Sequence, residues 1–191
     1  PSEDPTFPVI AFDSAAAKAK LAEAGYPDGK GLPEVTLMYN TSQGHQKIAE
    51  FIQQSWKENL GVEVKLVNQE WAVYLKTVNG EDTPQIYRLG WCADYPDENN
   101  WVLENFHSTL SLNNPKWHSA AFDKAVEDAQ KASDPAKRKE LYRQAEQILV
   151  HDEAAIAPIY YYTTVNVTKP YVNRLFSALG NEHFDKWTVN R

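Results

Sequence analysis

A chain of 191 residues with a hydrophobic content of 42% is long enough to bury a core of its own, as one large domain or one lobe of a larger protein. Its formal net charge of −7, with basic residues that do not cluster, argues against a nucleic-acid-binding surface. No apolar run of about 18 residues occurs, so no segment is expected to cross a membrane.

The chain opens with a proline-rich leading segment, residues 1–12, that we expect to be extended. Asp13 is suited to cap a helix, and the alanine-rich sequence behind it predicts a helix that ends at Gly25. The turn formers of PDGKGLP follow at residues 27–33.

A strand, a helix and a second strand are predicted next. Apolar and polar residues alternate over 35–39 and again over 62–66, which is the strand period. Between these segments, Ser42 can cap a helix that ends near Gly61. The expected apolar face of this helix is formed by Ile48, Phe51, Ile52 and Trp56. This order predicts a right-handed βαβ unit with parallel strands.

A short helix around Trp71 and a third strand near residues 85–91 follow. The sequence GWCADYPDENN, residues 90–100, therefore comes at the carboxyl end of a strand, the edge at which open α/β sheets bind ligands.

Two more helices are expected in the second half of the chain, beginning at Ser119 and Asp134. Residues 156–167 are rich in β formers and predict a long strand, while the tail from Lys169 is expected to be irregular. The predicted fold class is α/β, with a mixed sheet flanked by helices.

Catalytic and metal-binding interpretations of GWCADYPDENN find little support. As a nucleophile, Cys92 would need a neighbouring base, and no histidine lies in a local pattern that names it as one. A calcium loop counted from Asp94 would need glycine and glutamate where the chain has Asn99 and Asn105. We expect no metal and no cofactor. Paired-carboxylate hydrolysis stays open, because it requires a separation in space and not in sequence.

A binding site is the third interpretation. Trp91 would supply an apolar platform, and Asp94 a negative charge that is costly to bury unless it meets a cation such as a ligand ammonium group. Arg88 would face the opposite side of a regular strand from Trp91, unless the chain bends at Gly90. Arg88 is equally compatible with a surface position.

Three long segments carry a resemblance to a known family. RLGWCADYPDENN is preceded by NTSQGHQKIAEFIQQSWKENLGVEVKLVNQEW and followed by LYRQAEQILVHDEAAIAPIYYYTTVNVTKPYV. Together they resemble the C-terminal part of the oligopeptide-binding proteins of bacterial ABC importers, extracellular solute-binding family 5. The resemblance runs from AFDSAAAKAK to the end of the chain.

The resemblance implies a type II periplasmic-binding-protein fold, in which two lobes close over a ligand. Residues 13–165 would form most of the ligand-binding lobe, and residues 166–191 would return to the other lobe. The implied protein is a monomer that is not an enzyme, lies in the periplasm or is anchored outside the cytoplasm, and delivers short peptides to a membrane permease. The chain would be about the last third of it.

The same resemblance assigns roles to individual residues. Asp94 would pair with the α-ammonium group of the peptide, and Arg88 and His45 would meet its carboxylate. Backbone groups from Gly90 to Cys92 would pair with the extended peptide as an added strand does.

The remaining implied residues line side-chain pockets or join chain segments. The aromatic walls would be Trp91, Trp71 and Tyr162, and Asn113 would be a further pocket residue. The resemblance also implies that Cys92 forms a disulfide with a cysteine earlier in the protein, and this partner would lie upstream of the 191 residues, which contain no second cysteine.

Two alternatives accompany this reading. The same fold can bind another ligand, namely a murein peptide, a dipeptide, a nickel complex or a sugar. Less favoured is a hydrolase that uses Asp94 with a second carboxylate.

Overall fold

The computed structural model describes residues 10–177, 180 and 182–190. The chain divides between Gly90 and Trp91 into two compact units, which we call the N-terminal unit and the C-terminal unit. The boundary falls within GWCADYPDENN. Residues 1–9 of the predicted leading segment lie outside the described residues, and residues 10–12 form no helix or strand.

The N-terminal unit begins with helix α1 (Ser14–Glu23). The side chain of Asp13 caps it by accepting a hydrogen bond of 2.9 Å from the N–H of Ala16. The chain leaves the helix through Gly25, whose φ of +93° suits glycine, and enters a short turn of 3-10 helix (Pro27–Gly29). The predicted cap, helix and turn are confirmed.

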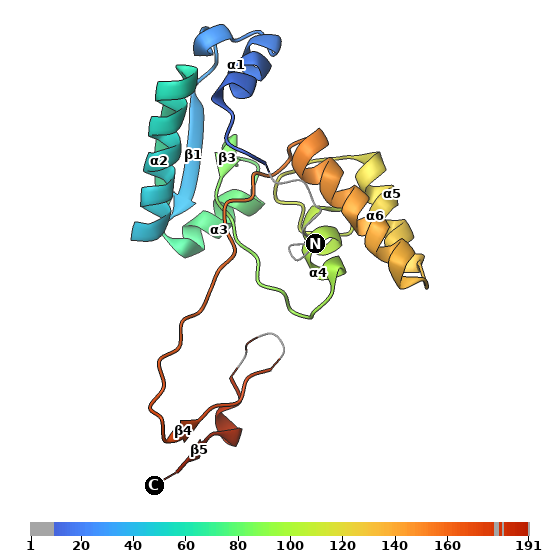
Figure 1. The fold of residues 1–191 in the computed structure, drawn as a ribbon. Helices are drawn as coiled ribbons and strands as arrows, with labels where there is room; N and C mark the ends of the chain where they lie inside the picture. Colours follow the sequence, from blue (N-terminus) through green and yellow to red (C-terminus); the bar gives the residue numbers. More distant parts are fainter. Residues whose placement is uncertain (1–9, 178–179, 181, 191) are drawn as a thin grey trace. The chain divides into compact units, whose positions relative to one another are not determined.

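A three-stranded parallel sheet follows in this unit (Figure 1). Its spatial order is β2 (Val64–Gln69), β1 (Val35–Asn40) and β3 (Ile86–Tyr87). Helix α2 (Gln43–Leu60) connects β1 to β2, and helix α3 (Trp71–Asn79) connects β2 to β3. The predicted strand, helix and strand with parallel pairing are confirmed.

The two helices cover opposite faces of β1. Leu37 and Tyr39 are buried in a cluster with Ala49 of α2. The residue between them in the strand, Met38, is buried with Tyr74 of α3. Because successive strand residues point to opposite faces, α2 and α3 lie on the two sides of the sheet.

Two details of this unit differ from the prediction. Phe51 is 73% exposed because it lies two positions, about 200° of helix rotation, from the buried Ala49. Strand β3 covers only Ile86–Tyr87 of the predicted 85–91, and Gln85 just before it contacts the β1 segment through its side chain. Its Oε1 accepts from the N–H of Thr36 at 3.1 Å, and its Nε2 donates to the carbonyl of Glu34 at 3.2 Å.

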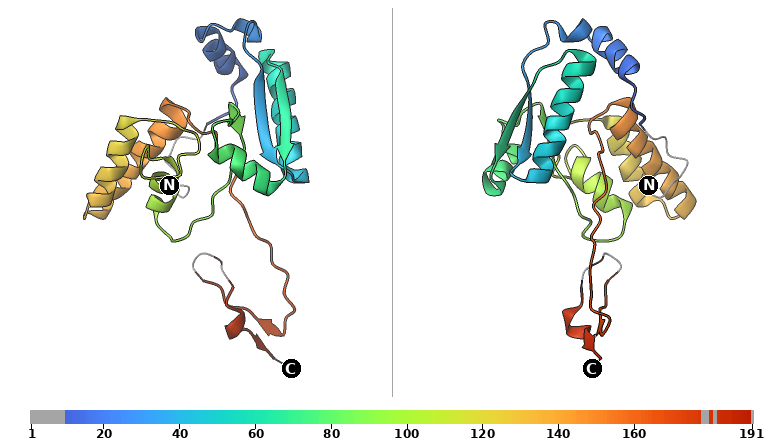
Figure 2. Two further views of the ribbon diagram at one scale, coloured as in Figure 1. Left: turned by 180° about the vertical axis from the view of Figure 1, so that it is seen from behind. Right: turned by 60° about the vertical axis from the view of Figure 1, so that its left-hand side comes forward.

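The C-terminal unit contains helices α4 (Glu98–Phe106), α5 (Ala120–Lys131) and α6 (Pro135–Gln147), and α6 continues into one π-helical turn (Ile148–Asp152). Each helix begins after a side chain that accepts a first-turn hydrogen bond: Asp97, Ser119 and Asp134. Both predicted caps, at positions 119 and 134, are confirmed. Helices α5 and α6 run side by side in Figures 1 and 2.

The core of this unit lies among the three helices. Its fully buried members include Phe122 and Val126 of α5 and Tyr142 and Ala145 of α6, with Val102 of α4 packed beside them.

The predicted strand at 156–167 is wrong for the described chain. These residues are extended but pair with no other strand there, and Val165 and Val167 are 87% and 94% exposed. A segment of residues with high β propensity forms a strand only where a neighbouring strand can hydrogen-bond to its backbone N–H and C=O groups. The tail is also more regular than expected, since β4 (Val172–Asn173) pairs antiparallel with β5 (Thr188–Val189).

Candidate functional site

The predicted site residues of the N-terminal unit lie at the carboxyl edge of its sheet. Strand β1 is followed by α2, which carries His45 in its first turn. Trp71 is the first residue of α3, directly after β2, and Arg88 follows β3. All three strands are parallel, so their carboxyl ends lie at one edge of the sheet. The structure therefore places His45, Trp71 and Arg88 at this common carboxyl edge.

Asn40, the last residue of β1, connects two of them. The Nδ1 atom of His45 lies 3.2 Å from the carbonyl oxygen of Asn40. The side-chain oxygen of Asn40 lies 3.5 Å from Nη1 of Arg88, at the long limit of a hydrogen bond. The two groups that the resemblance assigns to a ligand carboxylate therefore share one neighbour.

Arg88 is held in place through its main chain. Its N–H donates to the carbonyl of Met38 at 2.9 Å, which continues the β1–β3 ladder by one residue. Its carbonyl accepts a hydrogen bond from the hydroxyl of the buried Tyr74. Burial raises the pKa of Tyr74 to about 12, and the charge of Arg88 and this hydrogen bond act in the opposite direction.

Trp71 presents an aromatic surface at the same edge. Its ring lies nearly parallel to that of Tyr74, with centroids 6.0 Å apart and an interplanar angle of 15°. Trp71 is 47% exposed, so this ring pair leaves much of the indole open to a ligand.

The segment that joins the two units leaves its backbone groups unbonded by the residues that the structure describes. Within the described chain, no hydrogen bond uses the N–H or C=O groups of residues 89–93. Gly90 and Cys92 are both exposed. These groups are available to an extended ligand.

In the C-terminal unit, one buried amide holds two predicted site residues. The side-chain oxygen of Asn100 accepts a hydrogen bond from Nε1 of Trp91 at 2.9 Å and another from the N–H of Asp94 at 2.9 Å. The side chain of Asp94 is exposed, and its carboxylate makes no ion pair with any residue that the structure describes. An exposed carboxylate whose main chain is held in place, and which no described residue neutralises, is suited to an external cation.

A second layer of contacts fixes the loop that follows. Arg138 of α6 donates to Oδ1 of Asp97 at 2.7 Å and lies over the ring of Tyr142, 4.8 Å from its centroid. The hydrogen bond from Arg138 holds the pKa of Asp97 below its ordinary value, and the same contact raises the pKa of Arg138. Asp97 is thus a helix cap and an ion-pair partner at once.

Asn113 and Tyr162 have different surroundings. The side-chain amide of Asn113 makes hydrogen bonds within its own loop. Its nitrogen donates to the carbonyl of Trp117 at 3.0 Å, and its oxygen accepts from the N–H of Trp117 at 3.2 Å. Tyr162 is 57% exposed in the extended segment, and its ring meets that of Tyr160 at 4.9 Å between centroids. Their predicted roles toward a ligand stay predictions.

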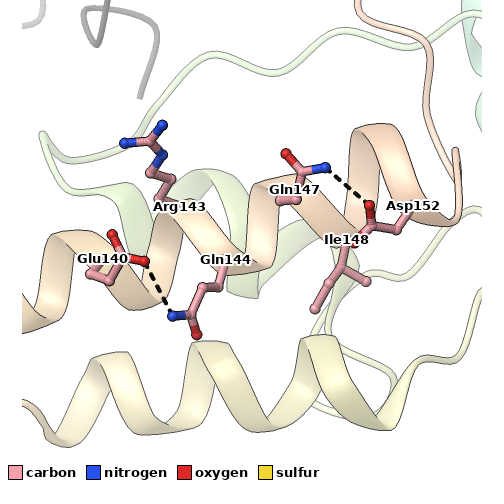
Figure 3. A pocket seen from close by; sticks show the side chains of 6 residues that line it. All are labelled: Glu140, Arg143, Gln144, Gln147, Ile148 and Asp152. Atoms are coloured by element: carbon pink, nitrogen blue, oxygen red, sulfur yellow. Dashed lines mark hydrogen bonds between the residues drawn. The ribbon is translucent and has the colours of Figure 1, made fainter. Parts of the chain in front are cut away.

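A separate groove of about 360 Å³ lies along α6 (Figure 3). Two hydrogen bonds join side chains that line it: Gln144 donates to Glu140 at 3.3 Å, and Gln147 donates to Asp152 at 3.0 Å. None of the predicted ligand residues lines it. In the described ranges, no cluster of three or more metal-ligating side chains occurs, and no helix has the length and apolar character to cross a membrane.

Sequence reasoning missed Asn40 and Asn100. The signal for Asn40 was a polar residue at the end of an apolar strand, a position that faces the ligand edge of a parallel sheet. Asn100 gave no such signal, because an asparagine in a first helical turn is usually a surface residue.

Comparison with known proteins identifies the family. The model of bacterial extracellular solute-binding proteins, family 5, middle region, matches residues 1–113. Periplasmic oligopeptide-binding protein OppA of Escherichia coli is 44% identical over 156 residues, which cover 82% of this chain and 28% of OppA.

Two solved structures are similar as well. The Escherichia coli murein tripeptide binding protein MppA matches with a TM-score of 0.75 and 39% identity, over 84% of this chain and 31% of MppA. Haemophilus influenzae OppA in complex with RPPGFSPFR matches with a TM-score of 0.74 and 33% identity, over 84% of this chain and 31% of that one. The chain therefore spans less than a third of the length of these relatives.

Proposed function

Because the chain belongs to family 5 of the bacterial extracellular solute-binding proteins, we propose that the complete protein captures short peptides outside the cytoplasm and delivers them to the membrane permease of an ABC importer. The names of its relatives support a peptide ligand, and one of them was solved with a bound nonapeptide, RPPGFSPFR. The chain itself would supply part of the binding cleft and no catalytic residue.

The exposed carboxylate of Asp94, next to a fixed tryptophan, is the observation that carries this proposal. It would bind the α-ammonium group of the peptide. The backbone of residues 89–93, which makes no hydrogen bond within the described chain, would bond the peptide main chain, and Arg88 and His45 would meet its carboxylate. Recognition through main chain and termini suits peptides of many sequences, since it ignores side-chain identity.

Trp71, Trp91 and Tyr162 would line the side-chain pockets, with Asn113 as a further pocket residue. Residues 13–165 would form most of one lobe, and residues 166–191 would return to a second lobe. The extended segment, residues 156–167, spans the boundary between these two parts.

A murein peptide is the second candidate ligand. Periplasmic murein peptide-binding protein MppA of Escherichia coli is 41% identical over 159 residues, close to the value for OppA. A murein peptide released from its glycan has a free α-ammonium group on its first residue, so the Asp94 contact suits both ligands and mass spectrometry of the bound molecule distinguishes them.

The complete protein, purified without denaturation, tests the ligand class by mass spectrometry of the molecules it releases. We expect a mixture of short peptides that are recovered intact after long incubation. A single sugar, a nickel complex, or hydrolysis of added peptide would contradict the proposal.

Cys92 would form a disulfide with a cysteine outside these residues. It is exposed, and the chain has no second cysteine, so only an external thiol can reach it. Thiol titration of the unreduced, denatured complete protein should find Cys92 unreactive. A reactive Cys92 under these conditions would exclude the bond.

A further inference from the structure

Asn100 is the most completely buried polar side chain near the predicted ligand residues, with 0% of its surface exposed. Its amide makes three hydrogen bonds. The oxygen accepts from Nε1 of Trp91 and from the N–H of Asp94, each at 2.9 Å, and the nitrogen donates to Oε2 of Glu104 at 2.8 Å. One side chain therefore ties the indole ring to the main chain of the candidate ammonium-binding residue.

The partner of its nitrogen is itself held. Glu104 lies one helical turn further along α4, and its other oxygen accepts a hydrogen bond from the hydroxyl of Tyr95. The orientation of the amide is fixed by these neighbours, because two donors face its oxygen and a carboxylate faces its nitrogen. Only a side chain with an acceptor and a donor at these two places satisfies all of them.

We propose that Asn100 is a positioning residue of the ligand site, which holds Trp91 and Asp94 in one fixed arrangement. Its effect on peptide binding rests on the proposed function, whereas the holding of Trp91 does not. Preorganisation of this kind strengthens binding because the ligand does not have to order the loop.

The donor and the acceptor can be exchanged between the two partners, which gives a rescue experiment. Asn100→Asp keeps the oxygen that accepts from Trp91 and Asp94 but puts a carboxylate against Glu104. The double variant Asn100→Asp with Glu104→Gln restores a donor, since the new amide can donate to the new carboxylate and still accept from Tyr95. Asn100→Ala removes all three hydrogen bonds.

Asn105→Ala is the matched control. Asn105 is also a buried asparagine of α4, but its amide donates to the carbonyls of Asn100 and Trp101 and contacts neither ligand residue. A merely structural loss should affect both positions alike.

The first readout is hydrogen exchange of the Trp91 indole N–H in the complete protein, labelled with 15N-tryptophan and assigned with Trp91→Phe. We expect exchange on the order of tenfold faster in Asn100→Ala, unchanged exchange in Asn105→Ala, and recovery in the double variant. Unchanged exchange in Asn100→Ala, or no recovery in the double variant, would overturn the inference.

The second readout is the affinity for trialanine. Asn100→Ala and Asn100→Asp should each bind on the order of tenfold more weakly, and the double variant should return close to wild type. Equal losses in Asn100→Ala and Asn105→Ala would overturn the positioning role. If wild type binds no peptide while the indole exchange responds as expected, the proposed function fails and the holding of Trp91 stands.

Discussion

Side-chain contacts, both to main-chain atoms and to other side chains, decide where individual residues of the candidate site lie. Asn40 contacts both His45 and Arg88, and Tyr74 donates to the carbonyl of Arg88. Each contact satisfies a polar group at the edge of a core, where an unpaired group is costly. The side chains of His45 and Arg88 are thereby kept at the site, and the hydrogen bond from Tyr74 fixes the main chain of Arg88.

Tyr74→Phe tests this at a fully buried side chain. The change keeps the ring and leaves the Arg88 carbonyl without its donor, so we expect the free energy of unfolding to fall by about 1–2 kcal/mol. Urea unfolding measures it. Tyr161→Phe, at a ring that is 73% exposed, should change stability by less than about 0.5 kcal/mol. Equal losses in the two variants would contradict the assignment.

The pair of Asp97 and Arg138 predicts a pH dependence. Arg138 holds the pKa of Asp97 lower in the folded protein than in the unfolded chain. Such a carboxyl stabilises the fold above its unfolded-state pKa, about 3.9, and the stabilisation is lost as the pH falls through the lower folded value. The ion pair of Asp97 and Arg138 should therefore contribute more to the free energy of unfolding at pH 6 than at pH 3.

Arg138→Gln should therefore lose stability at pH 6, by about 0.5–1 kcal/mol because both side chains are about one-third exposed. At pH 3 the difference from wild type should be smaller, with the contact between Arg138 and Tyr142 accounting for the remainder. Urea unfolding at the two pH values measures this, with Lys124→Gln as the exposed control. An equal loss at both pH values would refute the ion-pair explanation.

At the scale of elements, local signals predicted most of the fold. Asp13, Ser119 and Asp134 were recognisable as caps because a cap depends on a few neighbouring residues. Residues 156–167 were not predictable, since a strand depends on a partner far away in the chain. The start of β3 at Ile86 was equally hidden, because Gln85 contacts the β1 segment with its side chain and not as a strand residue.

The same distinction applies to the candidate site. Trp91 and Asp94 could be proposed from residue type and from their place after a strand. Asn100 could not, because its importance comes from the burial that the α4 packing creates around it.

Replacement by alanine should change the free energy of unfolding in opposite directions at two glycines of α2 and its C-terminal end, Gly44 and Gly61. Gly61 ends the helix with φ of +70°, and a Cβ there would lie 2.5 Å from the carbonyl oxygen of Asp28. Gly61→Ala should cost about 2 kcal/mol or more, since both the backbone and the contact are strained. Gly44 lies inside the helix, where a Cβ would approach nothing closer than 3.8 Å, so Gly44→Ala should stabilise by about 0.5–1 kcal/mol. Thermal or urea unfolding of both variants decides; a stabilising Gly61→Ala would contradict the turn geometry.

At the scale of the whole molecule, the predicted ligand residues divide between the two units. His45, Trp71 and Arg88 belong to the N-terminal unit, while Trp91 and Asp94 belong to the C-terminal unit. The chain also spans less than a third of its relatives. Binding is therefore a property to measure on the complete protein.

Calorimetry of the complete protein with trialanine and N-acetyl-trialanine tests the central claim most directly, in wild type, Asp94→Asn and the control Asp128→Asn. If Asp94 binds the α-ammonium group, acetylation should weaken wild-type binding by roughly 30-fold or more, corresponding to about 2 kcal/mol or more. The same should hold for Asp128→Asn, whereas Asp94→Asn should bind the two peptides about equally and weakly. Equal affinity of wild type for the free and the acetylated peptide would contradict the account.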